Sequence, residues 1–314
     1  REDLVTDGRH AKVSFTKDWK ADSERRDFTI NSIYLDQNGK IFDPQNGKSD
    51  LKEKKIKFIG KPQERIDEDY LRIIRFLRFS IQYKNFDKDQ DTLTIIKKNV
   101  PGILKISKER IFSEVIKIIK LENLHEVNSN KEFKEIFKIV FPEFKYLDRL
   151  NVLKNKNLKK HIISEYNLVL ALLLIDESNN HNYFTHKYKT SNLLKDNLNF
   201  LHKYFYEAKK NKNFFSKDLK KNIFFHNKEK IISLVKYYHA VTNSKNSEKI
   251  SGIIKKIKNT NIPEFPLTGE YLIKRGFKSG RKIGEVLKKV EKDWIKNNFS
   301  LGKDELNNLI KKYN

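Results

Sequence analysis

Acidic and basic side chains lie at helical spacing in a short run near residue 70. On a helix, Asp69 and Arg72 are three positions apart and share a face. Glu68 and Arg75 flank that face. A carboxylate only accepts hydrogen bonds and a guanidinium only donates them, so the pair can meet a base edge with an amino donor beside a ring-nitrogen acceptor. Cytosine and adenine offer that edge, whereas guanine and uracil offer the reverse. The run therefore predicts selection of CTP and ATP, with an ordinary helical salt bridge as the alternative.

A second polar group precedes an expected strand. Arg25 and Arg26 are adjacent, and two neighbouring guanidinium groups can clamp a phosphate bidentately. Asp27 and Asn31 follow, and a carboxylate and an amide can hydrogen-bond ribose hydroxyls. Each of these residues taken singly is weak evidence for a binding site. As a group, they predict contacts to the sugar and phosphates of a nucleotide.

Short strands are expected to position the second group. Runs of β-branched and aromatic residues at 12–15 and 28–36 predict strands. Residues 30–35 and 40–42 flank a Gln-Asn-Gly turn signal, which predicts a hairpin.

Helices are expected from residue 62 onward. Apolar residues fill 70–81 too densely for a surface helix, so this helix should be largely buried. Ser107 is the expected N-cap of a helix that runs through Ile119. Residues 155–160 and 243–246 are expected to be short polar links. Further helices are expected near 131–140, 164–175, 191–206, 229–242, 247–258 and 281–297. The expected fold class is α+β, mostly α.

Charge is concentrated in the second half of the chain. The 314 residues include 66 Lys and Arg against 41 Asp and Glu. Residues 151–314 hold 34 basic and 15 acidic residues, whereas residues 1–150 hold 32 and 26. A concentrated positive field favours a polyanion such as nucleic acid, although a bias toward Lys codons is an alternative source of the lysines.

Composition also limits the class of protein. The longest apolar run, 168–175, is too short to span a bilayer and predicts a buried helix. No stretch has the build of a signal peptide, so we expect a cytoplasmic protein. Cysteine is absent, which rules out disulfides and thiolate metal sites.

Taken in order, the polar runs resemble the class II CCA-adding enzyme and bacterial poly(A) polymerase family. The first motifs are Arg1-Glu2-Asp3, Asp7-Gly8-Arg9-His10, residues 25–31, residues 43–51, Arg65, residues 68–75, Arg78-Phe79, and Glu109-Arg110-Ile111 with Glu114. A second set, similar to the tail of bacterial CCA-adding members, comprises Pro266-Leu267-Thr268-Gly269, Leu272-Ile273, Gly276, Gly280, Ile283-Gly284, Leu287 and Trp294-Ile295. The resemblance is strong over residues 1–120 and only compositional between the two sets.

The resemblance implies a role for each nucleotide-binding residue. Asp69 and Arg72, with Glu68 beside them, would form the protein template for the incoming base, and Arg75 would lie near the triphosphate. The nucleotide-binding and ribose-binding group would be Arg25, Arg26, Asp27 and Asn31. A flexible loop at Asp7, Gly8 and Arg9 would help to switch between C and A addition.

The resemblance also implies a domain order and an RNA partner. Residues 1–60 would be the C-terminal part of the nucleotidyltransferase head, 61–123 a helical neck, 124–245 a helical body and 246–314 a helical tail. The partner would be tRNA, with CTP and ATP as substrates. The residues expected to bind RNA are Arg110, Lys274, Arg275, Arg281 and Lys282.

One departure from the family concerns catalysis. The family's catalytic Asp-x-Asp lies upstream of the first motif seen here, and two-metal chemistry needs such carboxylates. Asp18 and Asp22 are four apart in an expected loop and cannot replace them. We therefore expect no catalytic and no metal-binding residue in this chain, with Mg²⁺ held by residues upstream of Arg1, and we expect the chain alone to be inactive.

Two other functions remain as alternatives. A poly(A) polymerase or A-adding enzyme of the same family is one alternative, and a non-catalytic RNA-binding protein is another. Among lesser features, His161 and His239 are expected to be structural or surface residues. The aromatic residues between 203 and 221 are expected to pack in a core, with nucleotide stacking as the alternative. Glycines 276, 280 and 284 predict either an RNA phosphate site at a helix start or close helix packing.

Overall fold

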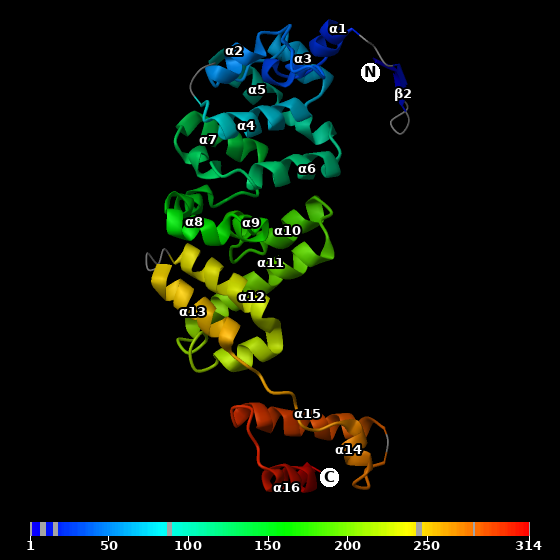
Figure 1. Ribbon diagram of the computed structural model, residues 1–314, viewed down its shortest axis with the longest axis vertical. Helices are drawn as coiled ribbons and strands as arrows, with labels where there is room; N and C mark the ends of the chain where they lie inside the picture. The colour runs from blue at the N-terminus through cyan, green and yellow to red at the C-terminus, as the bar shows by residue number, and fades with distance from the viewer. Residues whose placement is uncertain are drawn as a thin grey trace. The chain divides into compact units, whose positions relative to one another are not determined.

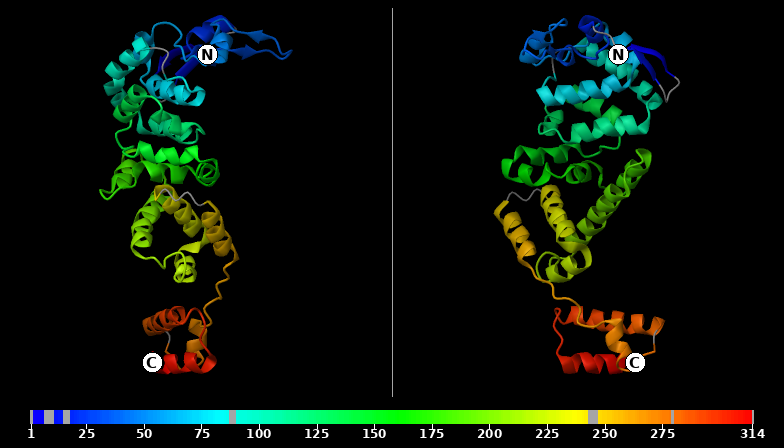
Figure 2. Two further views of the ribbon diagram at one scale, coloured as in Figure 1. Left: turned by 90° about the vertical axis from the view of Figure 1, so that its left-hand side faces the viewer. Right: turned by 45° about the vertical axis from the view of Figure 1, so that its right-hand side comes forward.

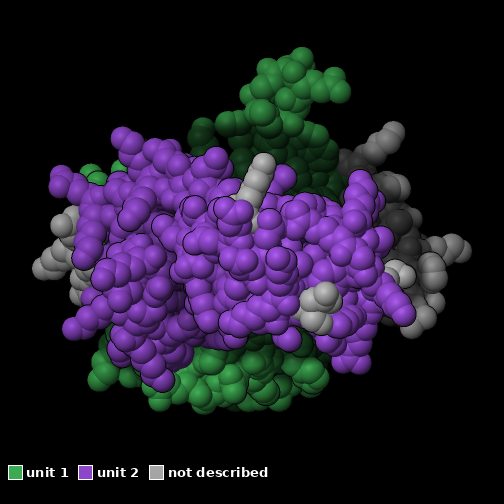
Figure 3. Space-filling view, turned by 90° about the horizontal axis from the view of Figure 1, so that it is seen from below, with its two compact units in different colours: residues 1–202 green, residues 203–314 purple. Residues whose placement is uncertain are grey.

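Helices form most of the architecture, and the strands that the structure describes are short. A computed structural model of the chain describes residues 2–6, 11–14, 18–86, 90–242, 247–278 and 280–313. It divides the chain into two compact units, Arg1–His202 and Lys203–Asn314 (Figure 3). The expected α+β, mostly α fold class is confirmed.

Two small antiparallel hairpins lie in the first 42 residues. Strand β1 (Glu2–Thr6) pairs with β2 (Ala11–Ser14), and β3 (Tyr34–Leu35) pairs with β4 (Ile41–Phe42). The second hairpin was predicted, and its turn is closed by the Asp36 carboxylate, which accepts bonds from the backbone of the turn residues.

The strand predicted at 28–36 is wrong in its first half. Phe28 forms only an isolated bridge with Phe58, and a 3₁₀ turn follows at Thr29–Asn31. The Ser32 hydroxyl donates to the Thr29 carbonyl at 2.7 Å, so a local bond replaces the ladder of a strand.

Unit 1 continues as a succession of helices (Figure 1). These are α1 (Trp19–Glu24), α2 (Gly47–Lys52), α3 (Pro62–Glu68), α4 (Leu71–Tyr83), α5 (Gln90–Asn99), α6 (Lys108–Ile119), α7 (Lys131–Val140), α8 (Lys156–Ile162), α9 (Tyr166–Leu174) and α10 (Asn180–Lys187). Helix α4 packs against α6, and α6 packs against α9. The apolar stripe of α4 is buried, as predicted, and so is all of 168–175.

Side-chain caps explain one helix start that was predicted correctly and one that was missed. Ser107 accepts a hydrogen bond from the Arg110 amide at 3.4 Å and caps α6, as predicted. The polar link predicted at 155–160 is wrong, because these residues begin α8. The Asn155 side chain caps that helix, and Leu158 and Ile162, four residues apart, turn its apolar side into the core.

Unit 2 is also helical (Figure 2). Helix α11 (Asn192–Lys210) leads into it, and the others are α12 (Leu219–Val241), α13 (Ser247–Asn259), α14 (Gly269–Ile273), α15 (Arg281–Lys296) and α16 (Lys303–Tyr313). Asn227 interrupts α12 with φ 62° and ψ 166°, which explains why the sequence predicted only its second part. The link expected at 243–246 lies outside the described residues. Buried residues of α14, α15 and α16, including Leu272, Val290 and Ile310, form a separate apolar core.

Within the described ranges, no helix is both long and apolar enough to cross a bilayer. The core-packing expectation for the aromatic residues after 203 is confirmed for Phe205 and Phe214, which are buried. The Phe205 ring packs against the Tyr237 ring with centroids 5.3 Å apart.

Candidate functional site

The predicted base-selecting residues lie at a break between two helices. Helix α3 ends at Glu68, Asp69 follows with an extended backbone (φ -156°, ψ 105°), and α4 begins at Leu71. The expectation that Asp69 and Arg72 share one helix is therefore wrong. The physical reason is local: the Asp69 carboxylate accepts a hydrogen bond from the Leu71 amide at 3.1 Å, which favours a new helix start over continuation.

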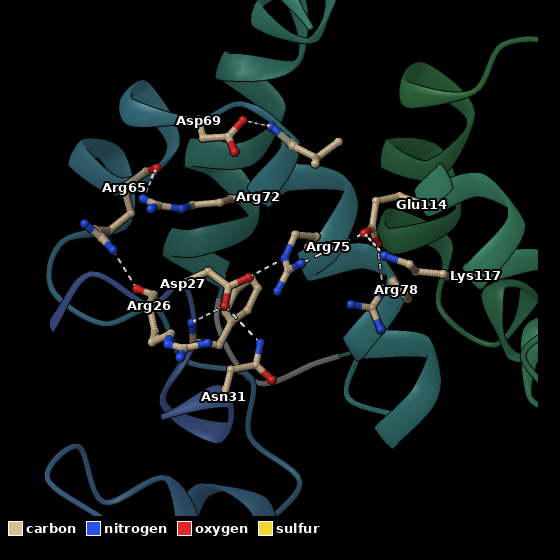
Figure 4. Close-up of polar contacts among 12 residues, drawn as sticks. Arg26, Asp27, Asn31, Arg65, Asp69, Arg72, Arg75, Arg78, Glu114 and Lys117 are labelled. Atoms are coloured by element: carbon tan, nitrogen blue, oxygen red, sulfur yellow. Dashed lines mark hydrogen bonds and ion pairs between the residues drawn. The ribbon is translucent and has the colours of Figure 1, made fainter. Parts of the chain in front are cut away.

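Arg72 is held on the α3 side of this break. Its Nη1 donates to Glu68 Oε2 at 2.6 Å. The same atom donates to the Arg65 carbonyl at 2.7 Å (Figure 4). Arg65 also donates to Glu68, so one carboxylate serves two guanidinium groups. Burial alone would raise the pKa of Glu68, but the hydrogen bonds and charges of Arg72 and Arg65 outweigh it and lower that pKa. The Arg72 side chain is thereby fixed while 14% of it stays exposed.

Asp69 is held by a different neighbour, Arg110 of α6. Its Oδ2 accepts a hydrogen bond from Arg110 Nη2 at 2.7 Å, across 41 residues of sequence. The two side chains are 31% and 53% exposed. Asp69 and Arg72 thus do not pair with each other, which excludes the simple salt bridge between them. Arg110, expected to bind RNA, is placed beside the predicted template.

Tyr70, between Asp69 and the start of α4, packs against a later segment of the chain. Gly102 packs so closely against it that a Cβ at residue 102 would come within 2.0 Å of the ring. The Lys105 ammonium lies 5.3 Å from the centroid of the same ring. The segment that carries Asp69 is therefore supported from residues of the following 3₁₀ helix, Val100–Lys105.

Two further predicted residues, Asn31 and Arg75, meet at Asp27. Its carboxylate is buried and accepts hydrogen bonds from Asn31 Nδ2 at 2.9 Å and from Arg75 Nε (Figure 4). The Phe28 amide donates to the same carboxylate at 3.0 Å. Asp27 therefore links the turn after α1 to helix α4.

Arg25 and Arg26 lie on the end of α1, not at a strand as expected, and Asp22 lies within this helix rather than in a loop. Both guanidinium groups pair with Asp22, which also accepts from the Tyr34 hydroxyl at 2.8 Å. Burial alone would raise the pKa of Asp22, but these three donors hold it well below its usual range. The Arg26 carbonyl accepts from Arg65 Nη2 at 2.6 Å, which ties this group to the template.

A buried carboxylate was not assigned a site role from the sequence. Glu114 of α6 accepts from Arg78 Nε at 2.8 Å and Lys117 Nζ at 2.7 Å, and Arg75 Nη1 lies 3.9 Å away. Its side chain is 3% exposed. A signal was present: Glu114 falls within the apolar stripe of α6, where a charge needs buried partners.

The other predicted residues lie elsewhere. Lys274 and Arg275 follow α14, and Arg281 and Lys282 begin α15; all four are exposed. Arg281 pairs with Glu285 at 3.1 Å. The expected flexible loop, Asp7, Gly8 and Arg9, lies outside the described residues.

The glycine-rich segment is not explained by close packing. A Cβ at residue 276, 280 or 284 would meet no atom within 4 Å among the described residues, so that alternative is wrong. Gly276 and Gly280 have φ of 89° and 139°, which only glycine adopts easily. At positions 276 and 280, the backbone conformation rather than contact between helices explains why glycine is present.

The site offers hydrogen-bond acceptors, donors and positive charge. In the part of the chain that the structure describes, no group of three or more His, Asp or Glu residues could hold a metal ion. The arrangement places hydrogen-bond acceptors beside donors and positive charge, which chemically suits a ligand that combines a base edge with phosphates.

The domains match families of nucleotide-transferring enzymes. Residues 1–57 match a "Poly A polymerase head domain", residues 85–147 a "Probable RNA and SrmB-binding site of polymerase A", and residues 161–309 a tRNA nucleotidyltransferase domain 2. Together with the fold, these matches define a nucleotidyltransferase of the poly(A) polymerase type.

Sequence relatives identify the family within this class of nucleotidyltransferases. The chain is 33% identical over 330 residues to the mouse (Mus musculus) CCA tRNA nucleotidyltransferase 1, mitochondrial, covering 99% of this chain and 71% of the relative. It is 30% identical over 319 residues to the Staphylococcus haemolyticus CCA-adding enzyme, covering 98% and 77%. The chain belongs to the class II CCA-adding enzyme family.

Solved structures share the fold. The Bacillus stearothermophilus CCA-adding enzyme in complex with CTP matches with a TM-score of 0.67 and 20% identity, covering 95% of this chain and 75% of that one. The Thermotoga maritima CCA-adding enzyme complexed with tRNA matches with a TM-score of 0.61 and 22% identity, covering 94% and 74%.

Proposed function

We propose that this protein takes part in adding C, C and A to the 3′ end of tRNA from CTP and ATP, and that Asp69 and Arg72 select the base. In this reaction the RNA 3′-hydroxyl attacks the α-phosphate of the nucleotide and pyrophosphate leaves. The observation that carries the proposal is the placement of a carboxylate and a guanidinium three residues apart, each fixed by a different neighbour.

Asp69 and Arg72 both retain hydrogen-bonding atoms that a ligand could use. A carboxylate has about four lone-pair sites, and Asp69 uses two of them, for Leu71 and Arg110. Arg72 uses only Nη1 for its contacts within the described residues. Asp69 can therefore accept from the amino group of cytosine or adenine while Arg72 donates to the adjacent ring nitrogen. Guanine and uracil would set donor against donor and acceptor against acceptor.

The neighbouring group would hold the rest of the nucleotide. Asp27 keeps Arg75 at the base of the site, and Arg75 is 30% exposed, enough to meet a triphosphate. Asn31, bound to Asp27, would meet the ribose. Arg25 and Arg26 would contribute positive charge from the end of α1. These roles follow the family resemblance.

Mg²⁺ is the proposed cofactor of the reaction, where it would stabilise the charge of the transferring phosphate and the leaving pyrophosphate. The described residues do not fit such an ion, since they contain no suitable acidic group. We therefore assign base and phosphate binding, and no metal-dependent step, to the residues described above.

Domain roles and compartment are further proposals. Residues 61–123 would act as the neck, 124–245 as the body and 246–314 as the tail, with Lys274, Arg275, Arg281 and Lys282 facing tRNA. The cytoplasm is the compartment proposed from the sequence, although the mouse relative is named a mitochondrial protein. Fractionation of cells that express the protein would distinguish the two.

The test is incorporation by the full-length protein of labelled CTP and ATP into tRNA that lacks its 3′ end. Asp69→Ala and Arg72→Ala should each lower addition of both nucleotides while tRNA binding stays unchanged. Each lost charged hydrogen bond should reduce nucleotide affinity by about 10- to 100-fold. Addition of ATP without CTP by the unaltered protein would favour an A-adding or poly(A) enzyme. Binding of tRNA without any transfer would favour a non-catalytic RNA-binding protein.

A further inference from the structure

The two arginines at the end of α1 are bound to a carboxylate of their own helix. Asp22 lies three residues before Arg25 and four residues before Arg26. Its Oδ1 accepts a hydrogen bond from Arg25 Nη2. Its Oδ2 accepts hydrogen bonds from Arg26 Nε at 3.1 Å and from Arg26 Nη2 at 2.9 Å. One carboxylate therefore engages both guanidinium groups that would meet the phosphates of a nucleotide.

A carboxylate resembles a phosphate in how it binds arginine. Both groups offer negatively charged oxygens on one central atom, and a guanidinium group meets either of them through neighbouring N–H donors. Arg26 points its Nε and Nη2 atoms at Asp22. The N–H groups bound to Asp22 are not available to a phosphate. Asp22 and a phosphate of the ligand therefore compete for the same edge of Arg26.

The surroundings of Asp22 permit such an exchange. The Asp22 side chain is only 14% exposed, whereas those of Arg25 and Arg26 are 41% and 44% exposed. The Tyr34 hydroxyl also donates to Asp22 Oδ2, at 2.8 Å, and the Tyr34 ring packs against the Trp19 ring with centroids 5.4 Å apart. The arginines can therefore turn to a ligand while Asp22 keeps a hydrogen bond from Tyr34, so its charge is not left without a donor.

The exchange favours a ligand with more negative charge than one carboxylate. Asp22 balances only one of the two positive charges of Arg25 and Arg26. A triphosphate carries several negative charges, so its attraction to both arginines exceeds that of Asp22. An anion with a single charge would replace one weak partner by another and gain little. Asp22 therefore sets a minimum charge for anions that bind at this position.

We propose that Asp22 is a specificity-determining residue of the nucleotide site, which occupies Arg25 and Arg26 until a polyphosphate displaces it. The opposite role is that Asp22 orients the two arginines toward the nucleotide, and its loss would then weaken binding. Competition is favoured because Asp22 uses the N–H groups that a phosphate would need. The proposal rests on the phosphate-binding role that the proposed function gives to Arg25 and Arg26.

The test is equilibrium binding of inorganic tripolyphosphate to variants of the full chain. Asp22→Asn removes the charge and nearly keeps the shape, and should tighten binding by about 3- to 10-fold because a neutral amide competes less for a guanidinium group. Asp22→Ala should give the same direction of change, and Asp22→Glu, which keeps the charge, should restore the affinity of the unaltered chain. Glu24→Gln is the matched control, since Glu24 is exposed on the same helix, and it should change affinity by less than about 2-fold.

A second set of variants tests whether the effect passes through the arginines. The pair Arg25→Ala and Arg26→Ala should weaken tripolyphosphate binding by about 10-fold or more, and adding Asp22→Asn to that pair should change affinity by less than about 2-fold. Asp22→Asn alone loses ion pairs, so it should unfold at a lower temperature and still bind more tightly. Weaker or unchanged binding by Asp22→Asn would overturn the proposal, and so would tightening that persists without the arginines.

Binding of CTP, measured in parallel, separates this proposal from the proposed function. CTP affinity should rise in Asp22→Asn by the same factor as tripolyphosphate affinity, while the preference for CTP and ATP over UTP and GTP stays unchanged. If no base is preferred but tripolyphosphate follows the expected pattern, base selection fails and the role of Asp22 stands. If CTP binds selectively and Asp22→Asn behaves like the Glu24→Gln control, only the role of Asp22 fails.

Discussion

Arg110 Nη2 donates a 2.7 Å hydrogen bond to Asp69 Oδ2 and joins helix α6 to the break between α3 and α4. Asp69 has an extended backbone outside both helices, so its helices alone do not fix its carboxylate. The orientation of the proposed base acceptor therefore depends on a residue 41 positions away.

Removal of this partner should weaken nucleotide binding. Arg110→Ala should raise the Kd for CTP and ATP by about 3- to 5-fold, as expected for a half-exposed ion pair. Arg110→Lys should restore part of the loss. Lys108→Ala on the same turn is the control and should have little effect. Tighter nucleotide binding by Arg110→Ala would mean that Arg110 competes with the base rather than orienting Asp69.

A backbone contact behind the site provides a second prediction. Gly102→Ala would place a Cβ within 2.0 Å of the Tyr70 ring and displace the segment between Asp69 and Arg72. Nucleotide affinity should fall by about 10-fold or more, and thermal stability should fall with it. Gly252→Ala is a matched control, because its Cβ meets nothing within 4 Å and α13 should gain up to about 1 kcal/mol. Normal nucleotide binding by Gly102→Ala would show that Tyr70 does not support the site.

The buried pair at Asp27 should be needed for folding of the head segment. Asp27→Asn removes the charge that faces Arg75 and should lower the free energy of unfolding by about 3 kcal/mol. Urea denaturation measures this loss. The exposed pair of Lys61 and Glu64, with N and O atoms 3.0 Å apart, is the comparison. Glu64→Gln should cost less than about 1 kcal/mol, and an equal cost for both variants would contradict the argument.

Stability should depend on pH through Asp176. Burial alone would raise its pKa, but hydrogen bonds from Lys145, Ser178 and Asn180 lower it to about 2. Because the folded pKa is below the unfolded value, the stabilisation is complete above about pH 4 and is lost as pH falls through about 2. Asp176→Asn should therefore lose about 2 kcal/mol at pH 7 and show a flatter acid dependence. Asp148→Asn, at an exposed carboxylate, should keep the acid dependence of the unaltered protein.

Sequence periodicity was enough for elements that bury one apolar face. It located α6, α7 and α15 closely, because each carries a regular apolar stripe, whereas α9 was located from its continuous apolar run at 168–175. It could not locate the break at Asp69, since residues on both sides of the break are compatible with a helix. Only the bond from the Leu71 amide to the Asp69 side chain marks the new start.

Ion pairs between residues far apart in the sequence were the second feature that the sequence could not predict. The residues of the site were named from motif order, but their partners were not. Arg75 meets Asp27 across 48 residues and Arg110 meets Asp69 across 41. Such pairs depend on how α4 and α6 pack against the head segment. No local spacing encodes that packing, which is why Arg110 was assigned to RNA rather than to Asp69.

Base selection by Asp69 and Arg72 is the central claim, and equilibrium binding of the four nucleotides to the unaltered chain and to Asp69→Ala tests it most directly. We predict that CTP and ATP bind the unaltered chain at least about 10-fold more tightly than UTP and GTP, and that Asp69→Ala removes the difference. Equal affinity of the unaltered chain for all four nucleotides, or selectivity that survives in Asp69→Ala, would contradict the account.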